Sequence, residues 1–179
     1  MNHDSYSDDY IAAILTSMRT FAVIGASANE SRPSFFVVKY LLAKGYAVHP
    51  VHPGTAGQTL LGQTVYASLS YCPAPVDAVD IFRKSEAAAE IVRDAIAQKD
   101  RLGLKVIWMQ FGVRDDAAAA EAEAAGFQVV MNRCPKIEYG RLSGEIGWIG
   151  VNSGVISNRR PKLSPLGVQS HLIGRPGKS

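Results

Sequence analysis

Short apolar segments alternate with longer segments of helical periodicity along most of this chain, and this order constrains the fold more than any other feature. The apolar segments are rich in β-branched residues and have the length of buried strands: residues 21–24, 46–51, 77–82, 105–109 and 127–131. Parallel strands need crossover connections, which are usually helices. The sequence therefore predicts an α/β protein with a three-layer Rossmann-like fold, in which helices cover both faces of a mainly parallel sheet of about five strands.

The helical segments carry recognisable start and stop signals. Ser7 and Ser85 are expected to cap a first helix, over residues 7–18, and a third helix. Pro33 opens the second helix, which Gly45 closes. Acidic residues at 115–116 open an alanine-rich helix, where their charge suits the positive end of the helix dipole. Residues 54–75 are rich in Gly, Thr, Ser and Pro, which predicts a loop with one short strand near residues 65–66.

The chain divides into one domain and two appendages. Residues 1–142 form the expected Rossmann-like domain, and residues 143–156, with several glycines and Trp148, form an arm expected to pack on the domain or on a partner. Residues 157–179 contain five basic residues and no acidic ones, which predicts a flexible tail. Removing those five charges from the net charge of +3 leaves residues 1–156 slightly acidic, at −2. A nucleic-acid partner is therefore not expected for the domain.

Cysteine content and hydropathy indicate the cellular compartment. Two cysteines cannot form a disulfide framework, so a reducing compartment is expected. The first apolar stretch follows Asp8 and Asp9, unlike a signal peptide, and no stretch approaches the roughly 20 apolar residues that span a bilayer. We therefore expect a cytoplasmic protein without a membrane partner.

Polar or glycine-rich residues follow each of the five expected strands. Parallel strands place their carboxyl ends at one edge of the sheet, where open α/β sheets bind ligands. We therefore expect these residues to converge on a binding site. The candidates are Gly25, Ala26, Ser27, Arg32, Pro33, His52, Pro53, Phe82, Arg83, Gln110, Gly112, Asn132, Arg133 and Cys134.

The segment from Gly25 to Pro33 predicts a phosphate site. Gly25 lets the backbone approach a ligand closely, and the start of the following helix offers free N–H groups. Arg32 can bind phosphate oxygens in a bidentate way. Ser27 and Glu30 interrupt the dinucleotide fingerprint G-x-G-x-x-G, and no carboxylate ends the second strand, which disfavours NAD. A Walker-type G-x-x-x-x-G-K-[ST] motif is absent, which argues against P-loop ATP hydrolysis.

Six motifs resemble, in chain order, those of the small CoA-binding proteins of bacteria and archaea. They are Val23-Ile24-Gly25-Ala26-Ser27, Arg32-Pro33, Pro50-Val51-His52-Pro53, Asp80-Ile81-Phe82-Arg83, Trp108-Met109-Gln110-Phe111-Gly112-Val113 and Asn132-Arg133-Cys134. These proteins are single Rossmann-like domains related to the CoA-binding domain of the succinyl-CoA synthetase α subunit. The resemblance covers about residues 10–142, and the arm from Glu145 to Arg160 resembles an extension found in part of the family.

The resemblance implies coenzyme A as the cofactor and divides the candidate residues by role. Gly25, Ala26, Ser27 and Arg32 would hold the pyrophosphate. The turn at His52-Pro53 would border the adenosine. Phe82, Arg83, Gln110 and Gly112 would line the path of the pantetheine, and Asn132, Arg133 and Cys134 would close the pocket.

Neither a catalytic constellation nor a metal-ligand cluster is visible in the sequence. His52 has no visible carboxylate partner to orient it as a base, which favours a structural or ligand-contact role. The two cysteines are isolated and the histidines lack zinc-like spacing. Cys134 suggests a mixed disulfide with CoA, since Arg133 beside it favours the thiolate. The alternative is that Cys134 is a buried small hydrophobe.

We therefore expect a module that binds CoA or an acyl-CoA as a carrier, sensor or regulatory subunit, without autonomous catalysis. Three alternatives stay open: an enzyme acting on an acyl-CoA, an NAD(P)-binding oxidoreductase domain, and a subunit that recruits a partner through the arm. The apolar residues of the arm also suggest a homodimer.

Overall fold

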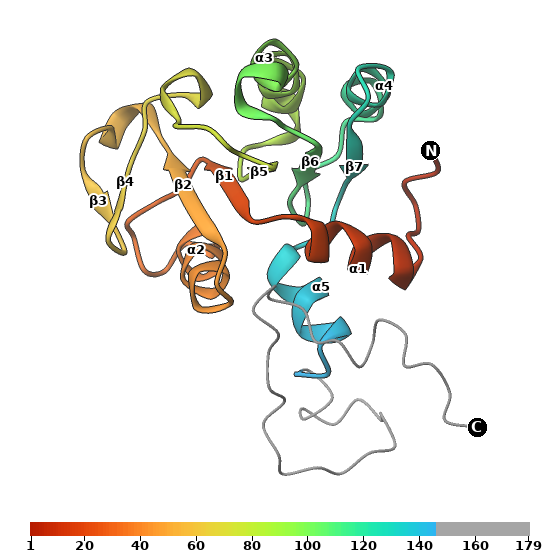
Figure 1. Ribbon diagram of the computed structural model, residues 1–179, viewed down its shortest axis with the longest axis horizontal. Helices are drawn as coiled ribbons and strands as arrows, with labels where there is room; N and C mark the ends of the chain where they lie inside the picture. The colour runs from red at the N-terminus through yellow and green to blue at the C-terminus, as the bar shows by residue number, and fades with distance from the viewer. Residues whose placement is uncertain (146–179) are drawn as a thin grey trace.

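Five parallel strands form the central sheet of the computed structural model, which describes residues 1–145 (Figure 1). The strands are β1 (Thr20–Ile24), β2 (Ala47–Val51), β5 (Ala78–Ile81), β6 (Val106–Met109) and β7 (Gln128–Val130). Their spatial order is β2-β1-β5-β6-β7, and every neighbouring pair is parallel. The predicted fold class and all five predicted strands are confirmed.

Helices cover both faces of this sheet and bury two separate cores (Figure 1). One face carries α1 (Asp8–Ser17), α2 (Pro33–Ala43) and α5 (Pro135–Leu142), and the other carries α3 (Ala88–Leu102) and α4 (Asp116–Ala124). Successive strand residues point to opposite faces, so Phe21 and Val23 lie in the first core and Ala22 in the second. Burial on both faces explains why the strands are almost continuously apolar.

Of the two expected caps, Ser7 and Ser85, only the first is present. The Ser7 hydroxyl accepts a hydrogen bond from the Tyr10 N–H (3.2 Å), and Asp115 accepts one from the Ala118 N–H (3.0 Å). The expectation that Ser85 caps a helix is wrong. Ser85 begins a 3-10 turn, Ser85–Ala87, and its hydroxyl accepts a hydrogen bond from the Arg114 N–H (3.1 Å). Ser85 thus ties the loop after β5 to the loop after β6.

The structure adds elements that the sequence patterns did not predict. A two-stranded antiparallel hairpin, β3 (Thr59–Leu60) and β4 (Gln63–Thr64), lies within the predicted loop. The short strand predicted near residues 65–66 is present only as an isolated bridge between Tyr66 and Val51. Helix α5 begins with Pro135 at its first position, a common helix start that periodicity alone misses. Of the predicted arm, only residues 143–145 are described, and the rest of the arm and the predicted tail lie outside the described residues. Across residues 1–145, each helix is too short or too polar to cross a bilayer.

Gly25 follows β1 at the point where this strand lies against the end of β5. Its φ is +85°, its N–H donates a hydrogen bond to the Val51 carbonyl (2.9 Å), and a Cβ built on it would lie 2.5 Å from the Phe82 carbonyl oxygen. Only glycine permits this approach of the two strand ends. Gly45 offers a control, because its φ is +87° but nothing lies within 4 Å of a Cβ built there.

We predict that Gly25→Ala lowers the free energy of unfolding more than Gly45→Ala does. Both substitutions place alanine in the left-handed region, at a cost of about 1–2 kcal/mol. Gly25→Ala adds a collision with backbone, which raises the loss by about 1–3 kcal/mol. Urea unfolding followed by circular dichroism measures both, and equal losses would contradict the packing role of Gly25.

Candidate functional site

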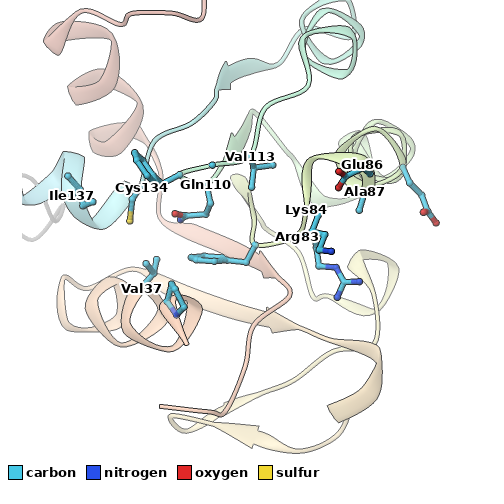
Figure 2. A pocket seen from close by; sticks show the side chains of 14 residues that line it. Val37, Arg83, Lys84, Glu86, Ala87, Gln110, Val113, Cys134 and Ile137 are labelled. Carbon is cyan, nitrogen blue, oxygen red and sulfur yellow. The ribbon is translucent and has the colours of Figure 1, made fainter. Parts of the chain in front are cut away.

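A large cavity opens at the carboxyl edge of the sheet, between the start of α2, the start of α5 and the segment that leads into α3 (Figure 2). Its volume is about 990 Å³, at the upper end of the range for small-molecule sites. The ends of β5 and β6 form its floor through Phe82 and Gln110. The cavity thus lies where ligands bind in open parallel sheets.

The two ends of this cavity differ in polarity. Val37 from α2, Ile137 from α5 and Cys134, which precedes α5, line one end, which we call the apolar end (Figure 2). Arg83, Lys84, Glu86 and Glu90 line the other, charged end, on the segment between β5 and α3. Gln110 lies between the two ends (Figure 2). The cavity therefore suits an elongated ligand with one charged and one uncharged end.

A second cavity of about 330 Å³ adjoins the first on the other side of β5. It is lined by Gly25, Val51, Pro53 and residues of the segment 67–69, together with the first turns of α3. The two cavities share Arg83, Ala87 and Glu90. Arg83 thus stands at their junction, next to the close packing of β1 on β5. Two cavities that meet at a cation can accommodate a ligand longer than either.

Most of the predicted residues lie at this edge, although only some line a cavity. Pro33, Phe82, Arg83, Gln110, Gly112 and Cys134 line the larger cavity, and Gly25, Pro53 and Arg83 line the smaller one. Ala26, Ser27, Arg32, His52, Asn132 and Arg133 line neither. Their roles as ligand contacts stay predictions, and several of their side chains form contacts within the protein instead.

Side-chain direction explains why these residues do not line a cavity. The Asn132 side chain accepts a hydrogen bond from the Gly112 N–H (2.8 Å) and so fixes the loop after β6. The guanidinium of Arg133 lies over the Tyr6 ring (5.6 Å) and near Glu138 (3.7 Å). His52 accepts a hydrogen bond from the Gly54 N–H (3.1 Å) and Ser27 one from the Asn29 N–H (3.2 Å), so both stabilise their own turns. Arg32 is exposed at the start of α2.

A buried carboxyl group lies beneath the cavity and was not among the predicted site residues. Asp80 of β5 is fully buried, and the Gln110 amide nitrogen donates to both of its oxygens, at 3.0 Å each. Burial raises the pKa of Asp80 to about 8, although the hydrogen bond from Gln110 acts in the opposite direction. The signal was present in the sequence, since a carboxyl group inside an apolar strand is costly and marks functional sites.

This pairing fixes the orientation of Gln110. The amide nitrogen of Gln110 lies 3.0 Å from each oxygen of Asp80, so the carbonyl oxygen of Gln110 points away from Asp80. Gln110 is 4% exposed and lines the larger cavity, and its carbonyl oxygen has no partner among residues 1–145. The floor of the cavity therefore presents a hydrogen-bond acceptor to a ligand.

The structure contradicts the expectation that Arg133 favours a Cys134 thiolate. Burial raises the pKa of the Cys134 thiol, and the carboxyl of Asp80 raises it further. Arg133 is occupied by Tyr6 and Glu138 instead. Cys134 is thus a weakly acidic thiol that faces the cavity, and it is 9% exposed.

Other lining residues were not predicted, because neither helical periodicity nor the order of loop residues says which side chains face the sheet edge. They are Val37, Lys84, Glu86, Ala87, Glu90, Phe111, Val113 and Ile137. Among residues 1–145, no three histidine, cysteine, aspartate or glutamate side chains are grouped as metal ligands.

A comparison with known proteins finds a family model whose matched region includes both the sheet and the site. A family model described as a CoA binding domain matches residues 19–140, from the start of β1 into α5. YneT, an uncharacterised protein of Bacillus subtilis, is 29% identical over 129 residues, which cover 72% of this chain and 91% of YneT.

Solved structures match the same region. A hypothetical protein of Pyrococcus horikoshii is 35% identical with a TM-score of 0.70, and the match covers 79% of this chain and 95% of that protein. A protein of Thermus thermophilus is also 35% identical with a TM-score of 0.70, over 76% of this chain and 98% of its own. These relatives span nearly the whole of their own chains, so the similarity covers a complete domain.

Asp80 makes a testable contribution to stability. An unfolded chain releases this proton near pH 4, whereas the folded chain holds it up to about pH 8. The stabilising contribution is complete below the lower value and falls as the pH rises to the higher one, by up to about 1.4 kcal/mol per pH unit. We predict that Asp80→Asn, which keeps an acceptor for Gln110, flattens this decline.

Urea unfolding of both proteins between pH 5 and pH 8 measures the difference. Asp77, whose pKa is lowered by the hydrogen bond from Lys105 and by backbone N–H groups despite its partial burial, is present in both proteins and cancels. Parallel stability curves for the two proteins would contradict the raised pKa of Asp80.

Proposed function

Because the chain belongs to the CoA-binding domain family over residues 19–140, we propose that it binds coenzyme A or an acyl-CoA across the two adjoining cavities. The observation that carries the proposal is the junction of the two cavities at Arg83. CoA is long and amphipathic, with phosphates between an adenosine and an uncharged pantetheine arm. Arg83, at a junction that also includes Ala87 and Glu90, offers a cation between a small cavity and a large one, which matches that order of groups.

The phosphates are assigned to the junction. Arg83 is exposed and forms no ion pair within residues 1–145, so its guanidinium is available for phosphate oxygens. Helix α2 begins nearby with Pro33 and has no side-chain cap, which leaves the Ser34 N–H of its first turn for an anion, since the Phe35 N–H donates to the Arg32 carbonyl. Arg32 stands at the same helix start. The assignment keeps the predicted phosphate segment and moves Arg83 to the phosphates from the pantetheine path that the resemblance implied.

The adenosine and the pantetheine are assigned to opposite sides of Arg83. The smaller cavity, bordered by Pro53, offers the carboxylates of Glu90 and Asp94 as acceptors for hydroxyl or amino groups. The larger cavity offers the Gln110 carbonyl oxygen, which suits an amide N–H of the pantetheine. The thiol or acyl end then reaches the apolar end, beside Cys134.

We further propose that the protein acts as a non-catalytic carrier, sensor or regulatory module. Neither His49 nor His52 lines a cavity, and the His52 ring accepts a backbone hydrogen bond rather than facing a carboxylate. Asp80 lies behind Gln110, fully buried, where it cannot reach a ligand directly as a general base. These positions support binding without autonomous catalysis.

Calorimetric titration of CoA, acetyl-CoA, NAD and ADP into the full chain tests the proposed function. We expect CoA to bind tighter than NAD, and Arg83→Ala to weaken CoA binding about tenfold or more, as the loss of a charge-assisted hydrogen bond does. Arg93→Ala is the matched control, because Arg93 lies on α3, pairs with Glu121 and lines neither cavity. Binding of NAD without CoA would overturn the proposal in favour of a redox domain.

Alkylation of the two cysteines locates the pantetheine arm independently. Acetyl-CoA, whose own thiol is blocked, should slow the reaction of Cys134 with iodoacetamide, because Cys134 lines the larger cavity. Cys72 is the internal control, since it is buried outside both cavities and burial raises its pKa to about 11. Mass spectrometry of the digested protein measures both rates. Equal protection of both cysteines, or protection of neither, would contradict the assigned position of the arm.

A further inference from the structure

Asp80 lies on the face of β5 that packs against α2 and α5, in largely apolar surroundings. Its neighbours across the sheet are Val23 on β1 and Trp108 on β6, and both belong to the core on that face. Within residues 1–145, its side chain forms hydrogen bonds only with the amide nitrogen of Gln110, at 3.0 Å from each oxygen. Gln110 in turn lines the larger cavity (Figure 2). Asp80 can therefore act on a ligand through Gln110.

The ionisable side chains of α2 and α5 do not compensate for a charge on Asp80. The charged ones have solvent or another partner: Lys39, Lys44, Lys136, Glu138 and Arg141. The tyrosines of this core stay protonated, because burial raises the pKa of each: Tyr40, Tyr46 and Tyr139. Cys134, just before α5, is a titratable neighbour on which the charge of Asp80 acts.

These surroundings favour the protonated form of Asp80 at neutral pH. Burial raises the pKa of Asp80 to about 8, and the hydrogen bond from Gln110 opposes this rise. The proton is thus held weakly enough that a change at Gln110 can release it. Any ligand contact that strengthens the hydrogen bond from Gln110 to Asp80 favours the carboxylate.

The ionisation of Asp80 is coupled to the orientation of the Gln110 amide. A carboxylate only accepts hydrogen bonds, and the structure shows the matching arrangement, in which the amide nitrogen faces both oxygens. A protonated carboxyl group has a hydroxyl group to donate, and a half-turn of the amide brings the Gln110 carbonyl oxygen into position to accept. The cavity then meets the amide nitrogen of Gln110 in place of the carbonyl oxygen.

We propose that Asp80 is a positioning residue for the pantetheine arm, and that binding of the arm at Gln110 releases the proton of Asp80 to solvent. A ligand N–H that donates to the Gln110 carbonyl oxygen holds the amide nitrogen toward Asp80, and this arrangement favours the carboxylate. The inference rests on the proposed function, which assigns an amide of the pantetheine to Gln110. It specifies the contact as a ligand N–H and makes affinity for the arm dependent on pH.

Counting the protons released on binding tests the coupling. Acetyl-CoA, whose own thiol is blocked, is titrated at pH 7 by calorimetry in buffers of different ionisation enthalpy. We expect the unmodified full chain to release between about half a proton and one proton more than Asp80→Asn, because asparagine cannot ionise. Asp100→Asn is the matched control, since Asp100 is exposed on α3 and lines neither cavity, and it should release as many protons as the unmodified chain.

Each outcome of this titration is decisive. If acetyl-CoA fails to bind, the proposed function falls and this inference with it. If acetyl-CoA binds but the unmodified chain and Asp80→Asn exchange equal numbers of protons, only the coupling is overturned. Proton uptake relative to Asp80→Asn would also overturn it, because the cavity would then present the amide nitrogen of Gln110.

A second variant separates positioning from a general structural role. Asp80→Leu removes the partner of Gln110 and leaves its amide free to turn. We expect the dissociation constant of acetyl-CoA to rise about threefold to tenfold, as the loss of one hydrogen bond does. ADP, which lacks the pantetheine arm, should bind within about twofold of its original affinity. Equal weakening of both ligands, or no change in acetyl-CoA binding, would contradict the positioning role.

Discussion

The close packing of β1 on β5 at their carboxyl ends determines most of what this protein can bind. Gly25 permits the contact, because any side chain there would meet the Phe82 carbonyl oxygen. The chain crosses to opposite faces of the sheet at this point, with α2 after β1 and α3 after β5 (Figure 1). The helices diverge above the two strand ends, and the cavities lie in the space that they leave. Arg83 follows β5 directly, so its position at the junction depends on the same contact.

The pair of Asp80 and Gln110 adds a second constraint, because it fixes the polarity of the cavity floor. A buried carboxyl group is costly, and here its one polar contact among residues 1–145 is the amide of Gln110. That contact determines which face of Gln110 the ligand meets. A stabilising apolar residue at position 80 would leave Gln110 free to turn. The cost of burying Asp80 is therefore consistent with a role in orienting a ligand-facing group.

The sequence predicted the strands and the edge where ligands bind, because both follow from residue order and apolar periodicity. The family match confirms the resemblance that the six motifs indicated. Sequence order did not predict the direction of the side chains. Asn132 and Arg133 follow β7 as expected. However, Asn132 stabilises the loop after β6, and Arg133 contacts Tyr6 and Glu138. Helix α5 was missed because eight residues are too few for a clear period, and so the apolar wall at Ile137 was missed with it.

The groups that could attack a thioester are held in their least reactive states. A thioester is cleaved by a thiolate or by water that a base activates, and Cys134 and Asp80 are the nearest candidates around the apolar end. Burial keeps Cys134 protonated at neutral pH, because it raises the pKa of the thiol. Asp80 faces Gln110 rather than the cavity. A site with these properties can hold a reactive ligand without consuming it, which is what a carrier or a sensor of acyl-CoA requires.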